Sequence, residues 1–576
     1  MIRRFLFKYL IDIDAFISGH IYEQKISKKY YRKIYSSLLR SQPIIKFFII
    51  CHFIFFKVFT LSLNNNKLKF FVLSLLFKFN IFQFNKILQL VFAIKQLSLG
   101  SDENILKIKF NNTDNKKDFY DNIVIGSGPS GCITGLKLSK AGFETLLIEK
   151  GNKYTLPKYK HPLSEFQKKW KYTGISGALG NYDFQYASGE CVGGGSEINS
   201  GLYHELDDVF LENLKKNNLN NLIKKKKFEW EYLLSNEDNE DSSFEQKNLK
   251  NYFFEGAKKL NLKLENLNIF FKNKKKNSMS KTILEDAIKL GCKIQENTEV
   301  VKIKKENNWV IETKKNGTKK KLFAKRIFLC CGAPYSFKLM KNSGYIKKNF
   351  NQMFHFHPMI KIIAKFPQKV NSSNNVNVVN TQISEYYPDF LFGNAASNLE
   401  FLKIFAFGNN RALSDIDKNF EYMSMFHVTF SLGSSSFIDL PMFDESLIKY
   451  KLSDNDIKIV TNGFEKLINF TFECGAEYIY IQDQKISKIS LQSDIKKIVS
   501  NYKFNFSSVH LLGGFKFGES NDAILNSYGK IKNKKLDGLY INDSSLLTEK
   551  LLKNPQGAIM SISSQNIEQA IKYINE

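Results

Sequence analysis

The feature that most constrains the fold of this chain is a glycine-rich turn set between two strand-like runs. Residues 120–125 form the first run, the turn occupies residues 126–131, a helical pattern extends to Gly142, and a second apolar run at residues 145–148 ends in Glu149. A strand, a tight turn, a helix and a second strand in this order are typical of a dinucleotide-binding fold. The sequence therefore predicts an α/β domain with parallel strands that begins near residue 119.

Each glycine of this turn has a separate expected role. Gly126 permits the turn, Gly128 lets the backbone approach a pyrophosphate, and Gly131 lets the helix pack closely on the strand. The phosphates would lie at the N-terminus of the helix, where backbone amides point outward, and Glu149 is placed for the ribose hydroxyls. The predicted cofactor-binding residues of this motif are Gly126, Gly128, Pro129, Ser130, Gly131 and Glu149.

A second glycine-rich turn, at residues 187–201, carries a more specific resemblance. It resembles the second FAD signature of the glucose-methanol-choline (GMC) oxidoreductase family, which includes choline dehydrogenase-like flavoproteins. The resemblance implies flavin contacts from Gly193, Gly194, Gly195 and Asn199. Some family members attach the flavin covalently through a histidine next to this asparagine, but here the position is Ile198. FAD is therefore expected to bind without a covalent bond.

Further segments match the family in its order along the chain. Residues 299–303 resemble the strand whose valine backbone meets the adenine, which points to Val301. Residues 327–344 resemble the next glycine-containing block of the family, and His357 and Pro358 stand at its D-H-P element, although they read alone as a turn.

The C-terminal region resembles the part of the family that carries the chemistry. By that resemblance Asp543 binds the diphosphate region of FAD, and the backbone around Pro555 and Gln556 approaches the pyrimidine edge of the flavin. His510 and Asn554 would face the reacting carbon.

The two residue types suit the oxidation of an alcohol. An imidazole titrates near neutral pH, so His510 can accept the hydroxyl proton while a hydride leaves for flavin N5. The amide of Asn554 can donate to the substrate oxygen and fix its orientation. Taken singly, His510 reads as a core histidine and Asn554 as a turn before proline. Together, with Asp543 between them, they predict a catalytic pair, although Gly514 stands where the family has threonine.

These features predict an FAD-dependent alcohol dehydrogenase or oxidase that acts on the CH–OH group of a sugar, a polyol or a lipid-type alcohol. No second G-x-G-x-x-G motif that could hold a nicotinamide cofactor is found, so the hydride is expected to come from the substrate or from a partner. Oxygen, a quinone or a cytochrome could each reoxidise the flavin. Two alternatives remain open: an FAD-dependent lipid desaturase or isomerase that does not depend on His510, and a non-catalytic membrane-associated protein that retained the fold.

Charge and cysteine usage argue against other classes of site. The net charge is +28, but arginine occurs only six times and forms no stripe with aromatic residues, so nucleic acid is not an expected partner. The lysine runs at residues 224–227 and 274–276 read as solvated loops. The seven cysteines form no C-x-x-C pair, and the histidines form no cluster, so neither a metal site nor a disulfide framework is expected. Most of the cysteines are expected to be buried.

The first hundred residues mix charge with apolar runs. Sixteen lysines and arginines face three acidic residues there, and the longest apolar run, residues 47–56, is half the length that a membrane-spanning helix needs. Residues 68–99 space Lys69, Lys78, Lys86 and Lys95 among apolar side chains. This spacing suits helices in a membrane interface with the lysines reaching outward, and it equally suits a helical domain that packs on the rest of the chain.

An export signal is not expected, because charged residues interrupt the apolar region that follows Arg3 and Arg4, and no cleavage site follows. The predicted location is therefore cytoplasmic, with a peripheral position on the inner face of the membrane if the N-terminal region binds lipid.

The predicted architecture is a discontinuous Rossmann-like FAD domain with a substrate domain built on an antiparallel sheet and a helical N-terminal extension. Residues 360–365 and 421–432 alternate like strands of that sheet. The expected parts are the N-terminal region 1–100, FAD segments 119–205, 281–344 and 504–576, an insertion at 206–280 and the substrate domain at 345–503.

Overall fold

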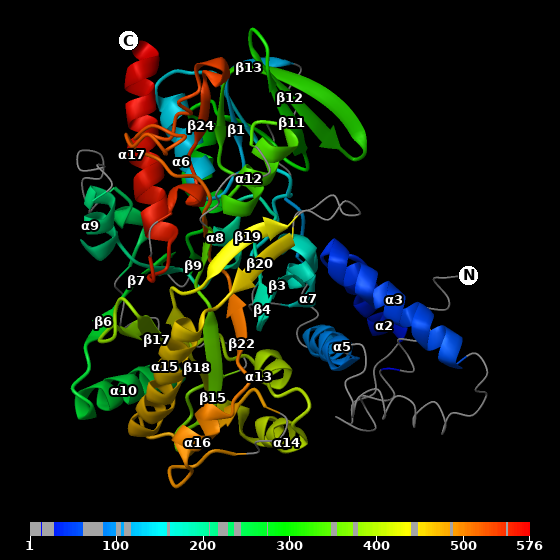
Figure 1. Cartoon of the computed structure of the whole chain (residues 1–576), viewed down its shortest axis with the longest axis vertical. Helices are drawn as coiled ribbons and strands as arrows, with labels where there is room; N and C mark the ends of the chain where they lie inside the picture. Colours follow the sequence, from blue (N-terminus) through cyan, green and yellow to red (C-terminus); the bar gives the residue numbers. More distant parts are fainter. Residues whose placement is uncertain are drawn as a thin grey trace.

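The computed structural model describes residues 13, 28–60, 84–99, 105–108, 117–157, 162–206, 208–216, 229–235, 243–272, 275–346, 354–372, 378–438, 447–483, 488–548 and 551–576. Several sequence features lie outside these residues, namely Arg3, Arg4, Lys69, Lys78 and the lysine run at 224–227. Figure 1 shows a smaller sheet with its helices at one end of the molecule, a larger sheet next to it, and the N-terminal helices to one side.

The smaller sheet is built on the strand–turn–helix unit expected from the sequence. β1 (Phe119–Ile125) pairs in parallel with β2 (Thr145–Ile148) and β13 (Thr318–Leu329), and α6 (Pro129–Lys140) connects β1 to β2. Within the described residues the strand order is β10-β2-β1-β13-β12-β11, and β24 pairs with β13. The other strands are β10 (Lys293–Gln295), β11 (Glu299–Lys305), β12 (Trp309–Lys315) and β24 (Leu539–Ile541).

The helices of this part cover the parallel strands. The last four residues of β1 are buried, as expected for a strand with helices on both faces. α6 packs against α11 (Ile283–Lys289) and α17 (Gln556–Asn575), and α12 (Ala333–Asn342) packs against β11. Segments from three separate parts of the chain therefore build one α/β domain, which confirms the predicted fold class.

The larger sheet is mainly antiparallel. Among the described residues its order is β23-β14-β19-β20-β3-β4-β22-β15-β18-β17-β16-β6, and β21 pairs with β15. Its strands are β3 (Gly177–Gly180), β4 (Asp183–Tyr186), β6 (Leu264–Asn266), β14 (Phe354–Phe356), β15 (Met359–Lys365), β16 (Thr381–Ile383), β17 (Phe390–Ala395), β18 (Met423–Phe430), β19 (Ser434–Ile438), β20 (Leu447–Lys451), β21 (Tyr478–Ile481), β22 (Asn505–Ser508) and β23 (Leu511–Gly513). The strands expected at residues 360–365 and 421–432 are confirmed as β15 and β18.

The large sheet separates a core from a cavity. Alternate residues of β18, such as Phe426, Val428 and Phe430, pack into a core with α10 (Phe244–Lys259) and α15 (Asp454–Glu473). The residues between them, including His427 and Thr429, line a cavity on the opposite face. The two-residue period of the strand thus puts apolar side chains on one face and polar side chains on the other.

The described structure also contains shorter helices and strands. They are α7 (Leu163–Lys169), α8 (Gly195–Ile198), β5 (Leu202–Tyr203), α9 (Asp208–Lys216), β7 (Asn268–Ile269), β8 (Phe271–Lys272), β9 (Lys275–Lys276), α13 (Leu399–Phe405), α14 (Asn410–Asn419) and α16 (Ile495–Ser500). Five of the seven cysteines are buried, as expected, whereas Cys51 is exposed and Cys331 is half-buried.

Three described helices form the N-terminal region: α2 (Lys28–Leu39), α3 (Pro43–Thr60) and α5 (Phe84–Leu99). α5 contacts α2, α7 and α13, and its Leu88 and Phe92 are fully buried in the shared core. Lys95 is also fully buried, so the alternative in which it reaches outward into a membrane interface is wrong for this lysine, and the alternative of a helix packed on the rest of the chain holds for α5. The reason is that α5 packs against α2, α7 and α13. Among the described residues, no helix has the length and hydropathy that a membrane-spanning helix needs.

Candidate functional site

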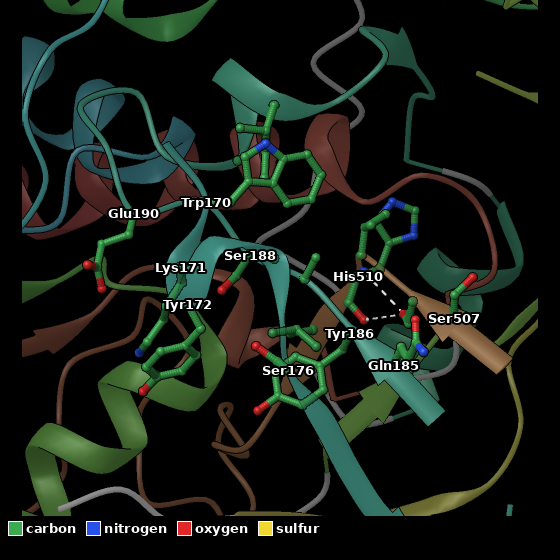
Figure 2. A pocket seen from close by; sticks show the side chains of 18 of the residues that line it. Trp170, Lys171, Tyr172, Ser176, Gln185, Tyr186, Ser188, Glu190, Ser507 and His510 are labelled. Atoms are coloured by element: carbon green, nitrogen blue, oxygen red, sulfur yellow. Dashed lines mark hydrogen bonds between the residues drawn. The ribbon is translucent and has the colours of Figure 1, made fainter. Parts of the chain in front are cut away.

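The predicted site residues meet at one continuous cavity of about 1930 Å³ between the two sheets and the N-terminal helices. Figure 2 shows part of it, with Trp170, Tyr186 and His510 around the space. The predicted residues that line the cavity are Gly126, Gly128, Pro129, Ser130, Glu149, Gly194, Gly195, Asn199, Val301, His510, Asp543, Asn554, Pro555 and Gln556. Gly131 and Gly193 lie behind this lining.

The three glycines of the first turn differ in what a side chain would meet. A Cβ at Gly126 would lie 2.3 Å from the carbonyl oxygen of Cys330, and one at Gly131 would lie 1.9 Å from the carbonyl oxygen of Gly126. A Cβ at Gly128 would meet no atom within 4 Å. The outer glycines therefore allow close packing, whereas Gly128 keeps a stretch of backbone open to the cavity.

The N-terminus of α6 faces this opening. Gly128 is the N-cap and supplies no side-chain cap, and the first turn holds no acidic residue. The first amides of a helix have no intrahelical partner and carry a partial positive charge, which suits a phosphate group.

Ser127 joins the first turn to its two neighbours. Its hydroxyl donates to the Glu149 carboxylate at 2.7 Å and accepts from the Gly193 amide at 3.1 Å. The backbone amides of Ser127 and Gly151 also donate to Glu149. Burial raises the pKa of Glu149 despite these hydrogen bonds. The carboxylate is thereby fixed at the end of β2, where the sequence predicts the ribose.

The second glycine turn touches the first. Gly194 has φ of +55° and ψ of −136°, a backbone conformation that side chains oppose, and a Cβ there would lie 2.9 Å from the Cα of Gly128. A Cβ at Gly195 would meet no atom within 4 Å. The two turns therefore form one cradle of exposed backbone.

The end of the chain closes this cradle. The side-chain amide of Asn199 donates to the side-chain oxygen of Gln556 at 2.5 Å, which ties the second turn to the start of α17. The carboxylate of Asp543 accepts from the Gly332 amide at 2.8 Å and from the Ser336 hydroxyl at 2.6 Å. Asp543 thus holds the start of α12 against the C-terminal segment, and its contact with FAD stays a prediction.

Val301 has an unusual place in β11. The register of β11 against β12 shifts between Val300 and Lys302, so Val301 has no partner in the ladder. A β-bulge of this kind leaves backbone groups unpaired and turns them away from the sheet. Val301 lines the cavity, as expected of a backbone that meets an adenine.

These residues fit an FAD molecule. Two glycine turns without Cβ atoms, an uncapped helix N-terminus and an acidic strand end all face the same cavity. The cavity is larger than the 300–1,000 Å³ usual for a small-ligand site, so it has room for a dinucleotide and a substrate together.

His510 is placed by the large sheet. It lies between β22 and β23, and β14 pairs with β23 so that Phe356 is opposite Leu511. The next residue after Phe356 is His357, whose Nδ1 lies 2.9 Å from the Nδ1 of His510. This contact was missed at the sequence level, where His357 read as part of a turn.

Burial favours the neutral form of both imidazoles. It lowers the pKa of His510 to about 4, with a smaller contribution from the nearby His204. Burial and then the charge of His510 lower the pKa of His357, while the Leu551 backbone opposes that shift. A neutral imidazole can accept a proton, and only one of the two facing Nδ1 atoms can carry the shared hydrogen.

Asn554 lines the same cavity just before Pro555. None of the described residues gives its side-chain amide a hydrogen-bond partner, so both the N–H groups and the oxygen are open to a ligand. His510 and Asn554 thus share the cavity, as expected, without a hydrogen bond between them.

Two polar residues of the cavity wall were not identified from the sequence. Lys361 of β15 and His427 of β18 are directly opposite each other in the ladder, and both line the cavity. Burial lowers the pKa of Lys361, and burial followed by the charge of Lys361 lowers that of His427 to about 3. The sequence did mark both residues, because each is a polar residue that alternates with apolar residues in a segment expected to form a strand.

Comparison with known proteins was informative at the level of family and fold. Two family profiles described as GMC oxidoreductase match residues 120–359 and 438–563. An uncharacterised GMC-type oxidoreductase of Sinorhizobium fredii is 24% identical over 493 residues, which cover 79% of this chain and 95% of the relative.

Solved structures share the fold. Pyridoxine 4-oxidase from Mesorbium loti superposes with a TM-score of 0.59 at 14% identity, over 79% of this chain and 99% of that one. A formate oxidase gives 0.59 at 12% identity, over 80% and 99%. At these identities the likeness concerns the fold.

Proposed function

The chain belongs to the GMC oxidoreductase family, and we propose that it oxidises the CH–OH group of an alcohol with non-covalently bound FAD. The observation that carries the proposal is that His510 lines the same cavity as the backbone of Gly128 and Gly194. A candidate proton acceptor is thereby combined with a candidate flavin cradle in one site.

The cofactor would be held by the two turns and the C-terminal segment. The first turn and the N-terminus of α6 would bind the diphosphate, Glu149 the ribose and Val301 the adenine. Ile198 replaces the histidine that forms a covalent bond in some relatives, which supports non-covalent binding. When bound, FAD would supply the electrophilic ring that takes the hydride from the alcohol carbon.

The chain's own residues would manage the hydroxyl group. If Nδ1 of His510 donates to Nδ1 of His357, the lone pair on Nε2 of His510 remains free for the hydroxyl proton. The C=O bond of the product forms as this proton moves to His510 and the hydride leaves the carbon. Asn554 would donate to the substrate oxygen and hold it while negative charge develops.

The proposal is tested with a panel of sugars, polyols and aliphatic alcohols on purified protein with an artificial electron acceptor. We expect oxidation of at least one class, with one two-electron reduction of the acceptor for each carbonyl formed. FAD-loaded protein that oxidises no alcohol would contradict the proposal and favour a desaturase or isomerase. Protein purified without flavin absorbance would favour a non-catalytic role. The acceptor in the cell, whether oxygen, a quinone or a cytochrome, is tested by replacing the artificial acceptor with each.

Contact with a membrane surface is a separate proposal. It is supported by Phe47 and Phe48 on α3, which are exposed beside Lys46 and which also line the cavity. Flotation with anionic vesicles is expected to fall in the double variant Phe47→Ser/Phe48→Ser. Equal flotation of the two proteins would contradict this contact.

A further inference from the structure

The cavity that holds His510 extends beyond the region shared with the family. Its wall includes α3 and α5, which precede the first residue matched by the family profiles. Together with α13 these helices supply apolar lining residues, among them Ile44, Phe47, Leu90, Ala93, Ile94 and Ile404. One end of the cavity is therefore built by aliphatic and aromatic side chains.

The start of α3 is anchored close to the catalytic end. The side chain of Gln42, which is buried, donates to the Tyr186 hydroxyl at 3.2 Å and accepts from the Gly177 amide at 3.0 Å. Tyr186 is paired with Ser508 in the β4–β22 ladder, two residues before His510. The apolar end of the cavity thus begins a few residues from the imidazole that accepts the proton.

α5 is fixed on the other side of the passage. Lys86, at its start, forms an ion pair with Asp183 of β4. Its buried face packs against α13 and the residues after it, where the rings of Phe92 and Phe407 have centroids 5.3 Å apart. Leu90 and Ala93 are only half-buried and line the cavity, which leaves apolar surface for a ligand.

The wall of the cavity next to His510 is polar. The face of the large sheet next to His510 carries Lys361, His427, Thr429 and Ser507, and Met359 is paired with both Thr429 and Ser507. A substrate that fills the space between this wall and the N-terminal helices therefore needs a polar group beside His510 and an apolar body extending toward α3 and α5.

We propose that the substrate is a long-chain aliphatic alcohol whose hydroxyl group lies at His510 and whose chain lies in the passage between α3, α5 and α13. This inference rests on the proposed alcohol oxidation and names its substrate class. Each methylene buried in such a passage strengthens binding about fourfold, so preference is expected to rise with chain length.

The first test measures kcat/KM for ethanol, butanol, octanol and dodecanol with the holoenzyme. We expect kcat/KM to rise along this series. In Ala93→Trp, whose side chain would fill the passage, the ratio of dodecanol to butanol is expected to fall at least about tenfold, the loss of about two buried methylenes. Leu39→Trp, a matched change on α2 outside the cavity, is expected to leave the ratio as it is.

The second test does not use catalysis and is carried out on the wild-type protein, with folded Trp170→Phe as its control. Trp170 lines the cavity and stacks on Phe166, whereas the two other tryptophans, Trp230 and Trp309, are buried outside it. A long-chain alcohol with bromine at its far end is expected to quench Trp170 fluorescence at saturable concentrations. Trp170→Phe is expected to remove the quenching.

The two proposals fail in different ways. If the enzyme oxidises sugars, polyols or short alcohols, shows no rise with chain length and no bromine quenching, the passage is overturned while alcohol oxidation stands. If the brominated alcohol binds and quenches but no alcohol is oxidised, the proposed function is overturned and the apolar passage stands.

Discussion

The two ends of the cavity are built in different ways. The cofactor end consists of exposed backbone at Gly128 and Gly194, held by hydrogen bonds through Ser127 and Asp543. The apolar end consists of side chains on three packed helices. At Gly194 a single added carbon would meet the backbone of Gly128, which cannot yield, whereas the second end changes in proportion to the volume added or removed.

The largest expected effect separates two glycines of the same turn. Gly131→Ala would put a Cβ 1.9 Å from the Gly126 carbonyl oxygen, so we expect a loss of more than about 4 kcal/mol of folding free energy. Gly128→Val would place its side chain in open space at an ordinary φ of −67°. It is expected to keep the thermal unfolding transition of the FAD-free wild-type protein and to lose bound FAD, as measured by flavin absorbance. Similar unfolding temperatures for the two variants would contradict the distinction between Gly131, which is needed for packing, and Gly128, which is needed for the cofactor.

The next effect tests whether the N-terminal helices belong to the folded body. Phe92 is fully buried, so Phe92→Ala is expected to lower the free energy of unfolding by about 3–5 kcal/mol in urea titrations. Leu39→Ala, at a position that is 36% exposed on α2, is expected to cost no more than about 0.5 kcal/mol. A small effect at Phe92 would show that these helices do not share the core.

The third effect concerns substrate positioning. Asn554→Ala is expected to lower kcat/KM by about 10²–10³-fold with FAD retained, because the substrate oxygen would lose a donor that acts as charge develops. Asn251→Ala, at an exposed position of α10, is the matched control and is expected to keep wild-type activity. An unchanged kcat/KM in Asn554→Ala would remove this residue from the mechanism.

The smallest effect is a shift along the pH axis. A base works only while it is neutral, and burial lowers the pKa of His510 to about 4. The acid limb of kcat/KM in the free enzyme is therefore expected near pH 4, well below the value of about 6.5 for an exposed histidine. A limb near 6.5 would show that His510 is solvated in the working enzyme or is not the base.

The difference between the two ends also explains what could be predicted from the sequence. The roles of Gly126 and Gly128 follow from local geometry, because a turn that needs bare backbone can be recognised from residues adjacent in the chain. The burial of Lys95 could not be predicted, since α5 packs on α2, α7 and α13, the last of which is some three hundred residues away. The pairing of His357 with His510 likewise depends on the register of β14 with β23, which neither strand encodes alone.

The sheet wall lies between these cases. Alternation in β15 and β18 predicted strands correctly, and it also marks Lys361 and His427 as members of the face opposite the core. Their identity as cavity residues required knowing that this face is covered, which follows from the N-terminal helices and the cofactor domain. Local sequence patterns thus predicted the strands, whereas the cavity residues depend on contacts between distant parts of the chain.

The most direct test of the central claim is anaerobic reduction of the bound flavin by an alcohol substrate in the wild-type enzyme and in His510→Ala. The account predicts that the wild-type absorbance near about 450 nm, typical of flavins, is bleached. His510→Ala would retain the same FAD content and be reduced at least about a hundredfold more slowly. Equal rates of bleaching in the two proteins would contradict the role assigned to His510 beside the two glycine turns.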